Sequence, residues 1–203
     1  MDRYILDLES SNVAVRKNAV CSMPKKREYI EKALRDRRAE VRTALIRYNP
    51  LTHDDRLVLV RDRSMGVRIT LAANRSLEDD IIDILLDDTI TRVRSQVVMN
   101  YSCKAHHLIK ALSDKSYVVR RNVLYNTFLP SEVLMAVMSN SDPMIANRGL
   151  NRGDITEKHL LLALKHNDLS VRYKALTHWK TTNAVKEEAA KDMELTMYLL
   201  TNN

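Results

Sequence analysis

A period of 26 residues runs through almost the whole chain and limits what it can fold into. A Val-Arg pair stands at Val15-Arg16, recurs at four further steps of 26 residues, and appears again at Val171-Arg172. The one missing copy falls on Ile145-Ala146, which keeps the apolar residue and lacks the arginine. Self-similarity at a fixed period of about 20 to 50 residues is typical of stacked repeats. We therefore predict seven repeats, centred on Arg16, Arg42, Arg68, Arg94, Arg120, Ala146 and Arg172.

Other columns keep the same register and indicate helices. The position six residues before the arginine is aspartate in four central copies: Asp36, Asp62, Asp88 and Asp114. The positions eight before and four after it are apolar throughout. Because apolar residues lie at helical spacing, each repeat is predicted to hold two short helices. In the third repeat we expect helices over 65–73 and 77–86, with Asn74 closing the first in the left-handed conformation and Ser76 capping the second.

The composition agrees with a helical array. Only 3 glycines and 4 prolines are present, which disfavours a turn-rich β fold, and 45% of the residues are hydrophobic. One helix pair cannot enclose a core, so neighbouring pairs must stack. We predict a single all-α domain over 1–203, ending in a capping helix over 186–203.

The order of apolar residue, aspartate, Val-Arg, small apolar residues and asparagine resembles the HEAT-like repeats and the leucine-rich repeat variant family. Asn49-Pro50-Leu51-Thr52 is close to the Asn-Pro pattern of the second family, shifted by one residue. The resemblance covers about residues 1 to 192. It implies a right-handed α-solenoid superhelix with the Val-Arg helices on a concave, often ligand-binding face. It also implies that the aspartate and arginine columns form a ladder of hydrogen bonds, so these arginines are scaffold.

The predicted concave face changes composition along the chain, from mostly uncharged in the middle repeats to basic and aromatic from the fifth repeat on. Such residues suit a phosphate backbone or an acidic protein surface, although an ordinary solvated face has a similar composition. The candidate partner-binding residues are Arg47, Arg121, Asn122, Tyr125, Arg148, Asn151, Arg152, Tyr173, Lys174 and Trp179.

The sixth repeat departs from the pattern. It has Asn140 in the aspartate column and Ala146 in the arginine column, and it contains Pro143, Gly149 and Gly153. Glycine inside a helix costs about 1 kcal/mol relative to alanine. We expect a kink or flexible point here, and both a functional and a degenerate repeat remain open.

We expect a non-enzymatic macromolecular scaffold, with a protein as the first choice of partner. The sequence contains no nucleophile elbow, P-loop or dinucleotide fingerprint, and no zinc-type spacing, so we predict no catalytic residue, cofactor or metal. The net charge of +7 keeps nucleic-acid binding as the alternative. A relative of the HEAT-like DNA glycosylases is a weaker alternative, because the predicted face has no acid and the chain has one Trp and one Phe.

Two cysteines without a disulfide framework favour a cytoplasmic location. No apolar run is long enough to cross a bilayer, so no membrane association is expected. A monomer or weak homodimer is predicted.

Overall fold

The computed structural model describes residues 2–127 and 129–202, and within these ranges every regular element is an α-helix. The prediction of an all-α solenoid repeat is confirmed. The chain divides into two compact units, Met1–Cys103 (unit 1) and Lys104–Asn203 (unit 2). The single domain over 1–203 stays a prediction. Among the described residues, no helix has the length and apolarity needed to cross a bilayer.

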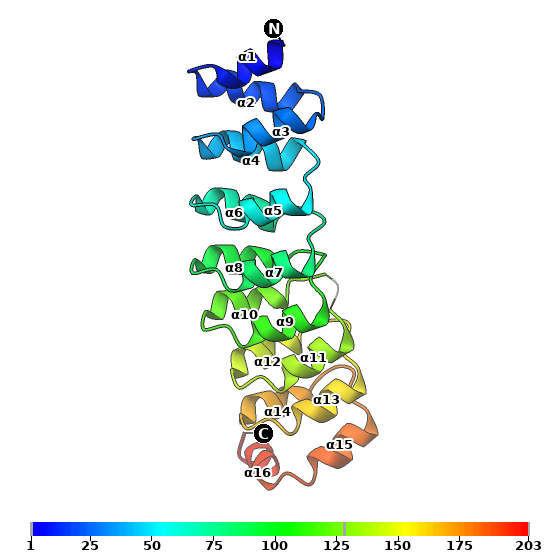
Figure 1. The fold of residues 1–203 in the computed structure, drawn as a ribbon. Coiled ribbons are helices and arrows are strands. Elements are labelled where there is room, and N and C mark those ends of the chain that lie inside the picture. Colours follow the sequence, from blue (N-terminus) through cyan, green and yellow to red (C-terminus); the bar gives the residue numbers. More distant parts are fainter. Residues whose placement is uncertain (1, 128, 203) are drawn as a thin grey trace. The chain divides into compact units, whose positions relative to one another are not determined.

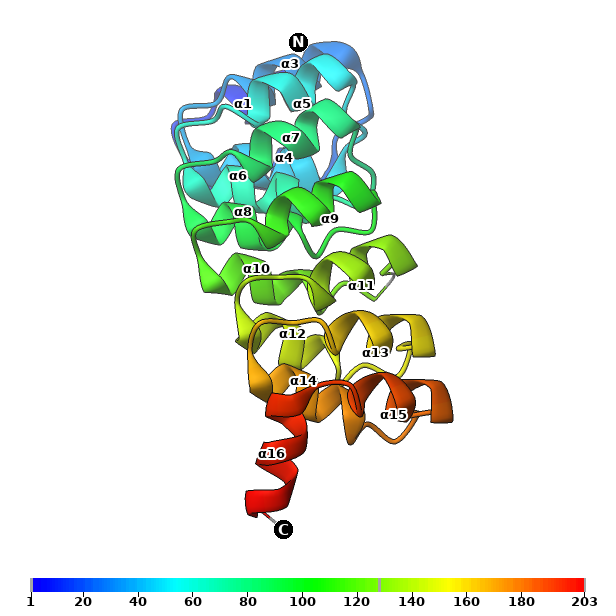
Figure 2. The ribbon, with the colours of Figure 1, turned by 90° about the horizontal axis from the view of Figure 1, so that it is seen from below.

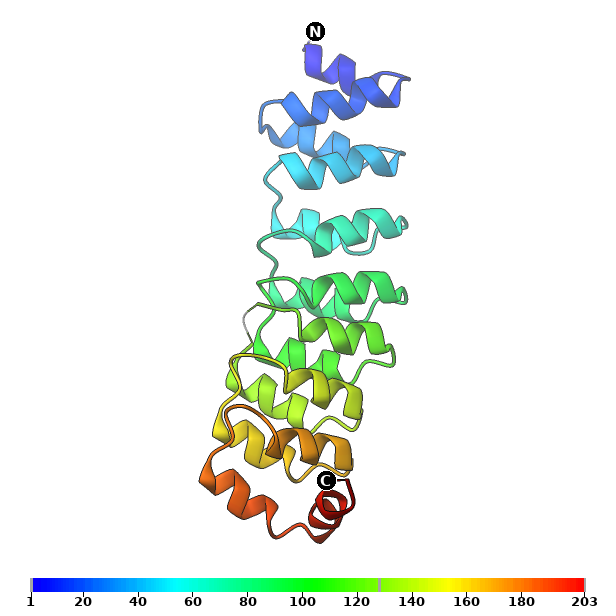
Figure 3. The ribbon, with the colours of Figure 1, turned by 180° about the vertical axis from the view of Figure 1, so that it is seen from behind.

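Each repeat consists of two antiparallel helices, which we call A and B, and the B helix carries the Val-Arg pair. In unit 1 the B helices pack against one another in succession, and each A helix packs on the B helix of its repeat (Figures 1 and 3). The A helices are α1 (Arg3–Glu9), α3 (Arg27–Leu34), α5 (His53–Leu59) and α7 (Asp79–Leu86). The B helices are α2 (Val13–Ser22), α4 (Ala39–Tyr48), α6 (Met65–Ala72) and α8 (Thr91–Val97).

Unit 2 repeats the arrangement, with A helices in one layer and B helices in the other (Figure 2). Its A helices are α9 (Ala105–Leu112), α11 (Ser131–Met138), α13 (Glu157–Ala163) and α15 (Asn183–Ala189). Its B helices are α10 (Tyr117–Val123), α12 (Pro143–Gly149) and α14 (Leu169–Leu176), followed by α16 (Met193–Asn202) in the corresponding place of a partial repeat.

In the third repeat, the helix boundaries predicted from local sequence can be compared with those in the structure. Helix α6 ends one residue before the predicted boundary. Helix α7 begins at Asp79, so the start predicted at residue 77 with Ser76 as cap is wrong. The backbone N–H of Leu77 donates instead to Ser102 Oγ of the next repeat at 3.1 Å. The left-handed conformation expected for Asn74 is also wrong, because no non-glycine residue among those described has a positive φ.

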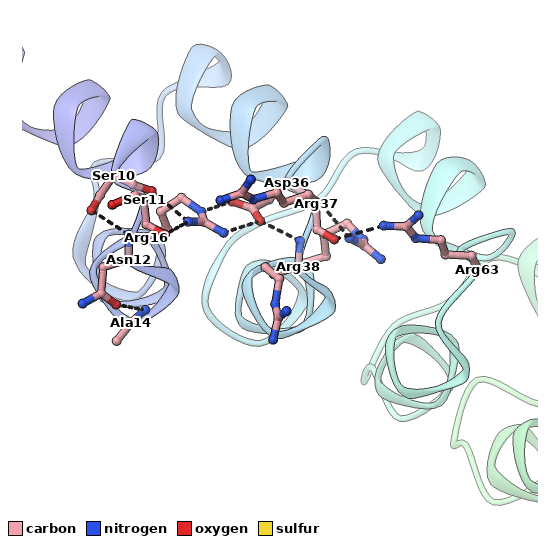
Figure 4. A network of polar contacts seen from close by, with 10 residues as sticks. Ser10, Ser11, Asn12, Ala14, Arg16, Asp36, Arg37, Arg38 and Arg63 are labelled. Atoms are coloured by element: carbon pink, nitrogen blue, oxygen red, sulfur yellow. Dashed lines mark hydrogen bonds and ion pairs between the residues drawn. The ribbon is translucent and has the colours of Figure 1, made fainter.

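A ladder of arginine–aspartate pairs joins successive repeats of unit 1. The Nε atom of the arginine lies 2.6, 2.5 and 2.5 Å from an aspartate Oδ2 of the next repeat in the pairs Arg16–Asp36, Arg42–Asp62 and Arg68–Asp88, respectively. The same guanidinium donates to a carbonyl of its own A–B turn, as from Arg42 to Asp36 O at 2.5 Å. Figure 4 shows Arg16 between its own turn and Asp36. Each arginine therefore fixes its own turn and the next repeat at once.

Each aspartate of the ladder also closes its own turn. Asp62 Oδ1 accepts the N–H of Ser64 at 2.8 Å, just as Asp36 accepts that of Arg38. Burial works against ionisation of Asp62, but the hydrogen bonds from Arg42 and Ser64 outweigh it, and its pKa lies below the ordinary 3.8. Because folding lowers this pKa, the stabilisation is complete above pH 3.8 and is lost as the pH falls through the lower value of the folded state.

The sixth repeat keeps the ladder's connections with different residues. Ala146 cannot reach the carbonyl of Asn140, and His166 Nε2 of the next repeat bonds that carbonyl at 2.8 Å instead. Asn140, in the aspartate column, has no negative charge to pair with Arg120. Arg120 instead pairs with Asp142, two residues further on, at 2.6 Å. These substitutions explain how the repeat stacks without its arginine. The B helix α12 forms as in the other repeats.

The capping helix predicted over 186–203 is two helices, α15 and α16, so this prediction is wrong. The break falls at Asp192, which occupies the aspartate column. Its Oδ1 accepts the N–H of Leu195 at 3.0 Å, and its Oδ2 lies 2.7 Å from Arg172 Nε. The turn and ladder of the repeat thus continue where a single helix was expected.

Gly149 in α12 allows helices α11 and α12 to approach closely. A Cβ at this position would lie 2.3 Å from Cγ1 of Val137 and 2.8 Å from Cε of Met138, both buried residues of α11. A Cβ on Gly153 would meet nothing within 4 Å. Gly149 is therefore required by packing, which is a structural reason for a glycine inside a helix.

We expect Gly149→Ala to lower the free energy of unfolding by about 1 to 3 kcal/mol, because overpacking outweighs the better helix propensity of alanine. Gly153→Ala is the matched control and should be neutral or slightly stabilising. Urea denaturation followed by circular dichroism measures both. A Gly149→Ala protein as stable as the parent would show that α11 and α12 can separate at little cost.

Candidate partner-binding surface

Five of the ten predicted binding residues line one pocket of unit 2. The pocket has a volume of about 200 Å³ and lies at the C-terminal ends of α10 and α12. We call it the Arg-Tyr pocket. Its lining residues are Arg121, Leu124, Tyr125, Arg148, Asn151 and Arg152. The repeat register brings these side chains together, since each is at or just beyond the last turn of a B helix.

Two arginines of the pocket carry uncompensated charge. The guanidinium of Arg121 lies 5.8 Å from the ring centre of Tyr125 and 6.0 Å from that of Tyr117. Arg148 is exposed. Among the described residues, neither arginine has a carboxylate within ion-pair distance. Both stand in the last turn of their helices, where the helix dipole favours a cation, so local structure already stabilises them in part.

Lys174 adds a third positive charge beside Arg148. Burial and the charge of Arg148 lower the pKa of Lys174. Its Nζ donates to the carbonyl of Asn147 at 2.7 Å, so part of its hydrogen-bonding capacity is used within the fold. Because the charge of Arg148 contributes to this shift, an anion beside the two cations would interact favourably with both.

Arg152 is a structural member of the pocket. Asn49 and Asn100 in unit 1 donate to carbonyls at the end of the preceding B helix, Val20 O at 2.9 Å and Ala72 O at 2.8 Å. Arg152 stands in the column of Asn100, one position from that of Asn49, and donates to Leu124 O at 2.6 Å. Its remaining donors form a two-point contact with Asp154, and this hydrogen bond holds the pKa of Asp154 below its usual value. The charge of Arg152 is therefore compensated.

The aromatic residues differ in exposure. Tyr125 and Trp179 are 58% and 77% exposed, whereas Tyr173 is only 37% exposed and packs its ring against Tyr198 of α16 at 5.3 Å between centres. Lys180 lies 4.9 Å above the Trp179 ring. Because Lys180 also donates to the carbonyls of Gly153 and Ile155, it ties the Trp179 turn to the turn that follows Arg152.

Like Tyr173, Lys174 and Trp179, the remaining two predicted residues, Arg47 and Asn122, do not line this pocket. Arg47 is exposed in the last turn of α4 and belongs to unit 1. Asn122 is half-buried in α10. Among the residues that the structure describes, no group of three or more His, Cys, Asp or Glu side chains could hold a metal ion.

Comparison with protein families, with curated proteins and with solved structures finds no match to the chain. The resemblance to HEAT-like and leucine-rich repeat variant repeats thus stays a prediction from the residues named above.

A group of exposed arginines in unit 1 was missed by the sequence analysis. They lie in the A–B turns of the second and third repeats, within Arg35-Asp36-Arg37-Arg38 and Arg61-Asp62-Arg63. The clustering of arginine in these two turns was visible in the sequence. These arginines lie outside the B helices, on which the predicted binding face was based.

The structure predicts different effects on stability when two arginines of the pocket are replaced by alanine. Arg152→Ala should lower the free energy of unfolding by about 1 to 2 kcal/mol, because it leaves Leu124 O and Asp154 without their donor. Arg148→Ala should change it by less than about 0.5 kcal/mol, as expected for an exposed side chain without partners. Chemical denaturation compares the two, and equal stabilities would contradict the structural role of Arg152.

Proposed function

We propose that the chain is a non-enzymatic protein-binding scaffold that holds an acidic segment of its partner at the Arg-Tyr pocket of unit 2. The observation that carries this proposal is the pair Arg121 and Arg148, two guanidiniums without a carboxylate partner beside the exposed ring of Tyr125. Arginine binds carboxylates through two parallel hydrogen bonds, so an Asp or Glu side chain is a suitable occupant.

The size of the pocket and its residue types favour a protein over a metabolite. Pockets for small molecules usually enclose about 300 to 1,000 Å³, and this one is smaller. Arginine, tyrosine and tryptophan dominate the energetically important positions of protein interfaces. Tyr125 and Trp179 offer apolar area that would lose water on binding. Lys180 ties the Trp179 turn to the turn after Arg152, and Arg152 donates to Leu124 O beside Tyr125.

Nucleic acid is the second candidate function, because the same cations would bind phosphate groups. The net charge of +7 favours it. We place the protein partner first, because Asp154 neutralises Arg152. The site then has only a short row of cations without a carboxylate partner among the described residues. The cytoplasmic location and the monomeric or weakly dimeric state belong to the same proposal.

The double variant Arg121→Glu/Arg148→Glu tests the proposal. We expect it to lose binding of a fluorescent Asp/Glu-rich peptide by at least about tenfold, because like charges then face the ligand. The same variant should fail to retain the protein that the parent chain captures from a cell extract. Fluorescence anisotropy and quantitative mass spectrometry are the measurements.

The matched control is Lys158→Glu/Lys186→Glu, which changes the net charge equally on exposed positions of α13 and α15. It should bind like the parent chain. An equal loss of peptide binding in both variants would show that overall charge, and not the Arg-Tyr pocket, accounts for the effect. If Arg121→Glu/Arg148→Glu loses oligonucleotide binding but captures protein as the parent does, the result would favour nucleic acid as the ligand of this site.

A further inference from the structure

A group of positive charges in unit 1 lies on the edge formed by its A–B turns. Five arginines in two adjacent turns are all exposed. We call them the arginine edge: Arg35, Arg37, Arg38, Arg61 and Arg63.

The ladder removes the acids that would otherwise neutralise this edge. Asp36 and Asp62 lie within the same turns, but their side chains are only 7% and 8% exposed and are paired with Arg16 and Arg42. The exposed pair of Arg38 with Glu40, at 3.2 Å, is the one ion pair between the edge and a carboxylate among the described residues. Four of the five arginines therefore present charge to solvent without an acidic partner.

The fold sets these charges in a repeating row. Arg37 and Arg63 are 26 residues apart, and Arg63 Nη2 donates to the carbonyl of Arg37 at 3.1 Å. Figure 4 shows Arg37 and Arg63 in neighbouring turns joined by this hydrogen bond, with the Arg38 side chain directed away from them. Because helices α4 and α6 pack directly, the two turns are separated by about 8 to 10 Å, the usual distance between packed helices.

The row is confined to two repeats, and the fold does not require it. The corresponding turn of the first repeat contains Ser10 and Ser11, and that of the fourth contains Asp87 and Thr89. Since Thr89 occupies the column of Arg37 and Arg63, a neutral residue is compatible with the same turn. The arginines are thus an added feature of these two repeats.

We propose that the arginine edge binds the phosphate backbone of nucleic acid. Guanidinium groups match phosphate geometry and stay charged at every relevant pH. A strand with one negative charge per nucleotide can meet successive turns, and backbone contacts of this kind need no particular sequence. The turns contain no aromatic residue, which is the residue type that anchors protein interfaces, so an acidic protein fits the edge less well. The inference is independent of the function proposed for unit 2.

Binding of a labelled single-stranded and a labelled duplex oligonucleotide to the full chain, measured by anisotropy at several salt concentrations, tests the proposal. Four phosphate contacts predict a slope of log K against log salt of about −3.6 for duplex and about −2.8 for single strands. Arg37→Glu/Arg63→Glu should weaken binding by at least about tenfold at about 50 mM salt and reduce the slope. Arg37→Gln/Arg63→Gln should weaken it in the same direction and serves if the charge reversal impairs folding, which circular dichroism detects.

The variant Lys158→Glu/Lys186→Glu is matched in charge and changes exposed positions of α13 and α15 in unit 2, so it should keep at least half of the oligonucleotide affinity. The proposal is overturned if this variant loses as much affinity as the edge variant, or if binding does not depend on salt. It is also overturned if polyglutamate of equal charge binds the edge more tightly than the oligonucleotide. Because peptide binding through the Arg-Tyr pocket is read with a different probe, the two proposals can fail separately.

Discussion

The arginine–aspartate ladder is the interaction on which the repeat stack depends. Two short helices cannot enclose a core, so each repeat must be held at a fixed position against the next. Arg42 does this by donating to the carbonyl of its own A–B turn and to the carboxylate of Asp62, while Asp62 also closes its own turn. One pair of side chains thus links the local shape of two turns to the packing between repeats. The pair is largely buried, and removing one member would leave the other without compensation, which is usually strongly destabilising.

The same ladder decides where charge remains available. The chain has 33 basic and 26 acidic residues, and several acids are used inside the stack. Among the described residues, four arginines at the edge of unit 1, and Arg121 and Arg148 at the ends of B helices of unit 2, then have no carboxylate partner. The sixth repeat shows that the connection matters more than the residue type, since His166 takes over the carbonyl that an arginine at position 146 would bind.

Much of the fold could be predicted from the sequence because its information is repeated. The period defined the helix pairs, the columns located the arginines, and the resemblance to HEAT-like repeats implied that they form a ladder. The errors arose where one contact departs from the average repeat. Leu77 bonds to Ser102 of the neighbouring repeat and delays the start of α7, and Asp192 breaks the final helix by pairing with Arg172. Such contacts join residues about 20 to 26 positions apart, and local helix propensity contains no information on them.

The candidate site was predictable in part for the same reason. Positions after the arginine column placed Arg121, Tyr125 and Arg148 on one predicted face, and all three line the Arg-Tyr pocket. The sequence could not show that Arg152 is paired with Asp154 or that Tyr173 packs against Tyr198, because both contacts depend on the conformation of connecting turns and of the last helix.

A double-mutant cycle on Arg42 and Asp62 tests the central role of the ladder most directly. The single variants Arg42→Ala and Asp62→Ala and the double variant are compared by urea denaturation at neutral pH. The account predicts a coupling free energy of about 2 kcal/mol between the two side chains, within the usual range for contacting buried groups. A coupling below about 0.5 kcal/mol would show that the repeats stack through apolar contacts alone and would contradict it.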